Sequence, residues 1–254
     1  MAQEYVDILG VKISSVDIPA ACAHIFRWIE QKNKTYVCIA PVSTVVRCQE
    51  DEQYRSIING AAMVTPDGMP LVWLGRLKGH KTIKRTYGPD LMLETCRLSQ
   101  ERNCAHYFYG GSQETCDLLE KNLRQKFPKI NIAGKYSPPF RNLSFEEDKA
   151  IVEEINRCSP DILWVGLGSP KQDIWMSEHR LRLNVPVMVG VGAAFDFIAG
   201  TKSQAPIWMQ NSGLEWIFRL CCEPGRLWRR YLIGNSKFIF YLLKDLVLGV
   251  SPKK

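Results

Sequence analysis

Short apolar runs alternate along the chain with longer stretches in which apolar residues recur at helical spacing. The runs are bounded by glycine, proline or polar residues, which is typical of buried parallel strands. They span residues 36–40, 61–64, 106–109, 130–133, 162–166 and 187–191. The stretches predicted to be helical span residues 44–59, 69–78, 91–102, 114–127, 145–157 and 171–182. This alternation predicts an α/β fold with a mostly parallel, Rossmann-like sheet covered by helices on both faces.

The two ends of the chain depart from this alternation. Residues 6–13 alternate across a glycine and predict a strand or a small hairpin, followed by a helix over residues 20–31. After Gly200 three tryptophans lie among arginines and no further strand is indicated. We therefore expect an α/β catalytic core over residues 1–200 and a helical C-terminal appendage over residues 201–254.

The positive charge of the chain is concentrated in the predicted appendage. Residues 201–254 hold nine Lys or Arg against three Asp or Glu, which is +6 of the total net charge of +7. A local excess of this kind indicates an anionic partner such as a phospholipid surface, a nucleic acid or a diphosphate. The alternative is a solvated helical face without a partner.

The nine cysteines include no C-x-x-C pair, which fits reduced thiols and a cytoplasmic protein. No signal peptide is visible at the N-terminus. No apolar stretch reaches the roughly 18 residues of a spanning helix.

Four loops that follow predicted strands could carry chemistry: residues 65–68, 110–112, 166–172 and 190–196. Parallel strands bring such loops to one rim of the sheet, where ligands bind. In the third loop we expect Ser169 to cap a helix and Pro170 to occupy its first position. Free amides at that helix start would form a seat for an anion.

Two aspartates in these loops have more than one interpretation. Asp67 lies in a Pro-Asp-Gly turn, where its side chain could simply bond the local backbone. Asp196 lies between two phenylalanines and is either a buried carboxylate with a raised pKa or a helix cap.

Several chemistries are disfavoured by their missing motifs. The two G-x-G loops have Lys171 and Phe195 where a dinucleotide-binding motif needs its last glycine, and no Walker A pattern occurs. The four histidines are dispersed, so no metal site and no cofactor are predicted. A diphosphate would then be neutralised by arginines and helix amides.

Taken together, the loops resemble the WecG/TagA/CpsF family of bacterial glycosyltransferases. The matching segments are residues 65–68, 85–92, 166–172, 190–196 and 213–216, and the last continues through Arg219 and Glu223-Pro224 to Arg226 and Arg229. The resemblance implies transfer of a hexose or N-acetylhexosamine, typically N-acetylmannosamine, from a UDP-sugar donor to a polyprenyl-diphosphate-linked sugar acceptor. It further implies inversion, no metal, and a role in surface polysaccharide or wall polymer synthesis.

The resemblance also assigns roles to individual residues. Asp67 is the candidate general base. Arg85 and Gln172, with Gly168 and Lys171 of the same loop, would hold the donor or its diphosphate, and Asp196 would orient a sugar hydroxyl. The arginines implied to reach the active site and the diphosphate are Arg219, Arg226 and Arg229. Their spacing puts them on similar helix faces if one helix continues through Pro224 and Gly225.

One segment departs from the family pattern. Where the family usually has Thr-Pro-Asn after the second strand, this chain has Ala40-Pro41-Val42. Ser43 or Thr44 could replace the lost polar groups. Glucose or another hexose therefore remains open as the donor sugar.

The tail composition extends the hypothesis to a membrane. Tryptophans beside arginines suit a headgroup region, and residues 238–248 are apolar with isolated charges, as in an interfacial segment. We expect peripheral association with the inner face of the cell membrane and no nucleic-acid partner, with a homo-oligomer left open. The alternatives are packing of these aromatic residues against the core, a non-catalytic nucleotide- or nucleic-acid-binding protein, and a nucleotide-dependent oxidoreductase.

Overall fold

The computed structural model describes residues 4–248 and divides them into two compact units. Unit 1 consists of residues 4–17, 40–87 and 204–248, and unit 2 consists of residues 18–39 and 88–203. Lys253 and Lys254 of the predicted basic tail lie outside the described residues.

Parallel strands form the centre of unit 2. These are β3 (Thr35–Ala40), β8 (Val187–Gly190), β7 (Ile162–Gly166), β5 (Ala105–Gly110) and β6 (Asn131–Tyr136), and neighbours in this order pair in parallel. With β4 (Met63–Pro66) they make a six-stranded sheet in the order β4-β3-β8-β7-β5-β6. The predicted α/β fold is confirmed.

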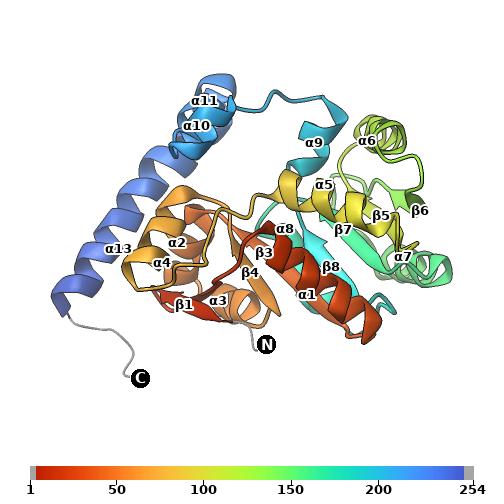
Figure 1. The fold of residues 1–254 in the computed structure, drawn as a ribbon, viewed down its shortest axis with the longest axis horizontal. Coiled ribbons are helices and arrows are strands. Elements are labelled where there is room, and N and C mark those ends of the chain that lie inside the picture. The colour runs from red at the N-terminus through yellow and green to blue at the C-terminus, as the bar shows by residue number, and fades with distance from the viewer. Residues whose placement is uncertain (1–3, 249–254) are drawn as a thin grey trace. The chain divides into compact units, whose positions relative to one another are not determined.

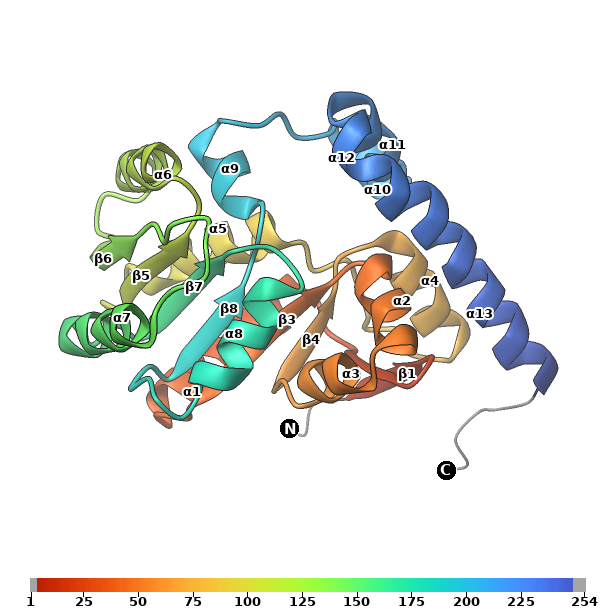
Figure 2. The same cartoon turned by 180° about the vertical axis from the view of Figure 1, so that it is seen from behind.

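Helices cover both faces of the unit 2 strands (Figures 1 and 2). One face carries α1 (Ile18–Glu30) and α5 (Gly88–Ser99), which contact each other. The opposite face carries α7 (Phe145–Cys158) and α8 (Lys171–His179). The short α9 (Ala194–Ala199) contacts α5 and also α6 (Gln113–Lys126). Strands β3, β5, β7 and β8 are buried because both faces are covered, which explains their continuous apolar runs, whereas the edge strand β6 is only partly buried.

Unit 1 combines a hairpin with helices from the middle and the end of the chain. Strands β1 (Tyr5–Ile8) and β2 (Val11–Ser14) pair antiparallel, and β2 contacts β4. Around them lie α2 (Val42–Glu50), α3 (Glu52–Asn59) and α4 (Met69–Leu77). The C-terminal part folds into α10 (Ile207–Asn211), α11 (Glu215–Cys222), α12 (Pro224–Trp228), a π-helical turn η1 (Arg229–Ile233) and α13 (Gly234–Leu248). The long α13 runs beside α2 and α4 (Figures 1 and 2).

The predicted elements are present with their ends shifted by up to three residues, and three differences affect the helices and loops discussed below. The single helix expected over residues 44–59 is two helices, because Asp51 leaves the helical conformation and its side chain accepts the Tyr54 N–H to begin α3. The strand expected over residues 61–64 spans Met63–Pro66, so the turn with Asp67 follows it directly. The loop over residues 190–196 contains the start of α9.

The end of β5 and the end of β7 approach each other closely. Gly110 has φ +129°, and a Cβ built on it would lie 2.6 Å from the carbonyl carbon of Gly166. Gly79 has φ +94°, but a Cβ there would meet nothing within 4 Å. Both glycines have a positive φ, but only at Gly110 would a Cβ also clash with a neighbouring backbone. Comparing the two positions therefore separates the cost of the backbone conformation from the cost of the steric contact.

We expect Gly110→Ala to destabilise the protein more than Gly79→Ala, by about 1–3 kcal/mol, because only the first also forces two backbones apart. Urea unfolding of both variants measures the difference. Equal losses in the free energy of unfolding would mean that the close approach of β5 and β7 at Gly110 does not contribute to stability.

Candidate functional site

The turn that carries Asp67 is held by backbone hydrogen bonds on both sides. Its N–H donates to the Ala40 carbonyl at 3.1 Å, and its carbonyl accepts the Arg85 Nε–H at 2.8 Å. The next residue, Gly68, is the N-cap of α4, and Pro70 lies in the first turn of that helix. Because the backbone is fixed, the Asp67 side chain has a defined direction.

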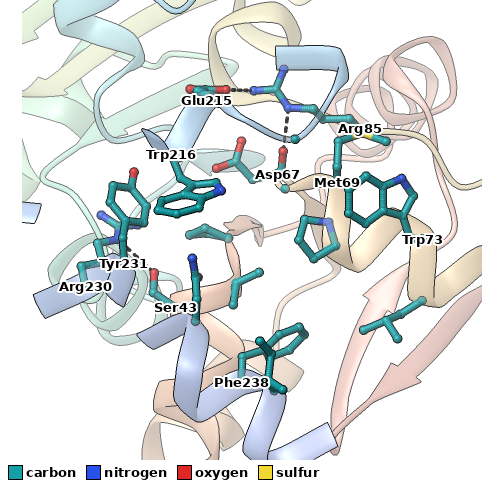
Figure 3. A pocket seen from close by; sticks show the side chains of 18 of the residues that line it. Ser43, Asp67, Met69, Trp73, Arg85, Glu215, Trp216, Arg230, Tyr231 and Phe238 are labelled. Carbon is teal, nitrogen blue, oxygen red and sulfur yellow. Dashed lines mark hydrogen bonds and ion pairs between the residues drawn. The ribbon is translucent and has the colours of Figure 1, made fainter. Parts of the chain in front are cut away.

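That side chain points into a cavity of about 470 Å³ in unit 1 (Figure 3). One part of the lining is polar and comes from Asp67, Arg85 and the segments around α2, α11 and η1. The other part is apolar and comes from α4 and α13. The residues used below are Ser43, Trp73, Leu77, Gln210, Glu215, Trp216, Arg219, Arg230, Tyr231, Phe238, Ile239 and Leu242.

The Asp67 carboxylate has one oxygen available for a ligand. Its Oδ1 is buried and accepts no hydrogen bond from any residue within 4–248. This oxygen therefore does not bond the local backbone, as a simple turn former's would. An unsatisfied buried acceptor is costly, and a hydroxyl or ammonium group of a ligand would satisfy it.

Arg85 ties the Asp67 turn to the C-terminal helices. Besides the Asp67 carbonyl, its guanidinium donates to Gln210 Oε1 at 3.0 Å and to the Glu215 carboxylate, and it stacks on Tyr87 at 4.0 Å. The Arg85 and Glu215 side chains are only 13% and 14% exposed. All three guanidinium nitrogens of Arg85 are used within the protein.

The polar part of the cavity has an excess of positive charge. Three arginines (Arg85, Arg219 and Arg230) line it with two carboxylates (Asp67 and Glu215). Burial raises the pKa of Glu215, and the charge of Asp67 raises it further, although Arg85 opposes this. Burial lowers the pKa of Arg219, but Tyr231, Asp67 and other acidic groups outweigh it, so the net shift is upward. The formal charge of the lining is +1, which favours an anionic ligand.

No three acidic, histidine or cysteine side chains within the described part of the chain are arranged to hold a metal ion.

The structure brings four of the predicted site residues together in this cavity: Ser43, Asp67, Arg85 and Arg219. It does not bring the other two predicted arginines to the lining. Arg226 pairs with Glu223, and Arg229 lies over the Trp228 ring at 5.2 Å. The expected single helix through Pro224 is interrupted, because Glu223 separates α11 from α12 with non-helical φ and ψ of −135° and 59°.

The remaining predicted residues lie in unit 2, where three glycine-containing loops meet. Gly168 N–H donates to Gln172 Oε1 at 3.0 Å, so the buried Gln172 side chain closes its own loop. A Cβ on Gly190 would lie 2.9 Å from Gln172 Nε2, and one on Gly166 would lie 2.5 Å from the Phe195 ring. The predicted clustering of these three loops is confirmed within unit 2.

Two details of these loops differ from expectation. Ser169 does not cap α8: Pro170 is the N-cap residue and α8 has no side-chain cap. Ser169 is instead within 3.4 Å of Gln172 Nε2. Asp196 lies in the first turn of α9 and is part-exposed, with an ion pair to Lys202 at 3.0 Å. Lys171 is exposed at the start of α8.

Sequence reasoning missed several residues of the cavity. Gln210, Phe238 and Arg230 belong to no motif that pointed to them. Arg230 directly follows Arg229, and only the rotation of the helix distinguishes which neighbour faces the cavity. A helical-wheel analysis of residues 224–242 could have suggested it, because Leu227 and Arg230 are three residues apart.

Comparison with known proteins identifies relatives that match most of the chain. The family model described as "Glycosyl transferase WecG/TagA/CpsF family" matches residues 6–250. An N-acetylglucosaminyldiphosphoundecaprenol N-acetyl-beta-D-mannosaminyltransferase of Bacillus subtilis is 27% identical over 86% of this chain and 82% of its own length. The enzyme with the same name in Staphylococcus aureus is 27% identical over 92% of this chain and 89% of its own length. The family resemblance predicted from the loops is confirmed.

The Arg85–Glu215 pair provides a stability prediction. Arg85→Met removes the guanidinium from beside a nearly buried carboxylate, which leaves the Glu215 charge uncompensated. We expect a loss of about 3 kcal/mol in the free energy of unfolding, measured in urea. Arg226→Met is the matched control, because the Arg226 side chain that pairs with Glu223 is half-exposed, and it should cost less than about 1 kcal/mol.

The raised pKa of Glu215 predicts a pH effect for the variant Glu215→Gln. Because the pKa of Glu215 is raised in the folded state, its contribution to stability is fully present below the unfolded pKa and is lost as pH rises through the folded pKa. The stability of the wild type relative to Glu215→Gln should therefore decrease as pH rises through this window. If the difference in the free energy of unfolding between the wild type and Glu215→Gln were independent of pH, it would contradict the raised pKa of Glu215.

Proposed function

Because the chain belongs to the WecG/TagA/CpsF family of glycosyltransferases, we propose that it transfers a hexose or N-acetylhexosamine from a UDP-sugar to a polyprenyl-diphosphate-linked sugar. The reaction inverts the anomeric centre and contributes to a surface polysaccharide or wall polymer. The observation that carries this proposal is the unpartnered Asp67 Oδ1 in a cavity that is cationic on one side and apolar on the other.

In the proposed mechanism Asp67 is the general base. Its Oδ1 accepts the proton of the acceptor hydroxyl while the hydroxyl oxygen attacks the anomeric carbon of the donor. The bond from that carbon to the UDP oxygen breaks in the same displacement, and UDP leaves with the electron pair. A positioned base supplies roughly 10²- to 10⁴-fold in rate. Arg219, which senses the Asp67 charge, contributes positive charge beside the reacting groups.

The apolar part of the cavity supports a lipid-linked acceptor. Trp73 and Leu77 of α4 lie opposite Phe238, Ile239 and Leu242 of α13. Leu77 is 83% exposed and Ile239 is 57% exposed, so apolar surface of the lining remains open to a ligand. A sugar or a nucleotide alone does not need such a surface, whereas a polyprenyl chain would bury it.

The roles of the unit 2 residues and the donor sugar remain predictions. Gly168, Lys171, Gln172 and Asp196 are proposed to bind the UDP-sugar. The related enzymes are named for N-acetylmannosamine transfer, but Ala40 and Val42 replace two polar residues of the family pattern. We therefore propose glucose or another hexose as donor beside N-acetylmannosamine. A screen of UDP-sugars with one lipid-linked acceptor separates them.

The C-terminal helices are proposed to dock on the inner face of the membrane. Eleven of the 17 large apolar side chains exposed within residues 4–248 lie between Ile207 and Val247. Phe240, Leu243 and Leu246 of α13 are 61%, 56% and 79% exposed. An apolar surface of this size beside basic residues suits a lipid headgroup region. None of the described helices combines the length and hydropathy that a membrane crossing requires.

Asp67→Asn tests the catalytic assignment. We expect kcat for UDP release from a UDP-sugar, in the presence of a short-chain lipid-linked acceptor, to fall at least about 100-fold because the base is removed. Thermal unfolding should be unchanged. Asp117→Asn, an exposed carboxylate paired with Lys135 in unit 2, is the matched control and should retain full activity. Full activity of Asp67→Asn would reject Asp67 as the base.

Replacing Phe240, Leu243 and Leu246 together by serine tests membrane docking. Burying such side chains in lipid contributes about 1.5–3 kcal/mol each, so the triple variant should bind vesicles of phosphatidylglycerol and phosphatidylcholine at least tenfold more weakly. Vesicle co-sedimentation measures this. Phe140→Ser, at a position 95% exposed in unit 2, is the control and should bind like the wild type. Unchanged binding of the triple variant would exclude this surface.

A further inference from the structure

The helical segment from α12 through η1 to α13 presents one face to the rest of unit 1. Leu227 and Phe238 are buried at 1% and 5% exposure and define that face. Arg230 and Tyr231 continue it and line the cavity. Each residue of a helix is rotated by about 100° from its predecessor. Arg226 and Arg229 stand one position before Leu227 and Arg230, and this rotation turns both of them to solvent.

A π-helical turn lies at this point of the helix. It spans Arg229–Ile233 and directly precedes α13. Such turns insert an additional residue into a helix and are frequent at functional sites. Here two consecutive side chains, Arg230 and Tyr231, both reach the cavity. The spacing of Arg226 and Arg229 in the sequence therefore does not indicate which arginine faces the ligand.

Arg230 lies in an environment that lacks a compensating anion. Its Nε donates to Ser43 Oγ at 3.1 Å, a neutral partner, and it forms no ion pair with any residue within 4–248 (Figure 3). Burial lowers the pKa of Arg230, and the positive charges of Arg219 and Arg226 lower it further, against Tyr231 and Asp67. A largely buried cation of this kind is stabilised when an anionic ligand binds beside it.

We infer that Arg230, together with Arg219 and the Ser43 hydroxyl, binds the diphosphate of a substrate in this cavity. The inference rests on the proposed function and specifies the residue that recognises the charged diphosphate of the substrate. A guanidinium matches phosphate oxygens with two parallel N–H donors. Ser43 accepts from Arg230, which leaves its own hydroxyl proton to donate to a phosphate oxygen. Arg226 and Arg229 take no part in this contact.

The apolar wall favours the lipid substrate as the source of the diphosphate. Ile239 and Leu242 lie on α13, on the same helical segment as Arg230. A molecule with a diphosphate at Arg230 and an isoprenoid chain along α13 would use both parts of the lining. A UDP diphosphate offers the same charged chemistry without the chain, so the two sources must be tested separately.

Calorimetric titrations with farnesyl diphosphate, farnesol and UDP measure the contact without catalysis. For wild type we expect binding of farnesyl diphosphate and much weaker binding of farnesol. Arg230→Ala should weaken diphosphate binding about 10- to 100-fold, because hydrogen bonds to a charged group are lost. Lys244→Ala removes an exposed cation of α13 that does not line the cavity; it is the matched control and should bind like the wild type. If Arg230→Ala loses affinity for farnesyl diphosphate, the site belongs to the lipid substrate. If it loses affinity for UDP, the site belongs to the donor. Unchanged binding of both by Arg230→Ala overturns the inference, as does a loss confined to Lys244→Ala.

Steady-state kinetics distinguish ligand binding from a structural role. Arg230→Ala should raise the KM of the substrate whose diphosphate it binds, about tenfold or more, with unchanged thermal unfolding. Arg230→Lys should restore part of the loss, because it keeps the charge but not the paired donors. A Tm loss with unchanged KM would overturn the inference. If farnesyl diphosphate binding depends on Arg230 but no UDP-sugar is turned over, the proposed function fails and the diphosphate site stands. If sugar transfer occurs without any dependence on Arg230, the proposed function stands and the diphosphate site at Arg230 is rejected.

Discussion

The Arg85 guanidinium connects the parts of unit 1 on which the cavity depends. It fixes the carbonyl of Asp67, bonds the side chains of Gln210 and Glu215 from the C-terminal helices, and stacks on Tyr87. A planar group with donors on three nitrogens can make these contacts at once, whereas a lysine cannot. The C-terminal helices are thereby part of the wall around Asp67.

The use of Arg85 within the protein changes the distribution of charge in the cavity. Arg85 and Glu215 neutralise each other, so Asp67 faces Arg219 and Arg230 with one unsatisfied oxygen and one excess positive charge. Both imbalances cost free energy unless a ligand compensates them. A substrate that brings a hydroxyl for Asp67 and an anion for the arginines removes both costs. Preorganisation of this kind lets the protein bind such a substrate without rearranging its charges.

Local sequence patterns predicted the strands and the post-strand loops because these depend on burial and on glycine conformation. The break at Asp51 was missed, since a capping aspartate inside an amphipathic stretch looks like any polar helix residue. The pairing of Arg85 with Glu215 joins residues 130 positions apart, and no local pattern contains it. Arg230 was missed because Glu223 interrupts the helix and resets its phase, so motif spacing did not determine which arginine turns inward.

Helix α13 is apolar on more than one side, and this links the cavity to the proposed membrane surface. Phe238 and Leu242 face the cavity, while Phe240, Leu246 and Val247 are exposed. A helix that is apolar on several sides is not satisfied by packing on one partner alone. In the proposed function both sides contact hydrocarbon, the substrate chain on one and the bilayer on the other. A polyprenyl acceptor could then enter from the membrane along α13 without its chain crossing water, which explains why one helix carries both surfaces.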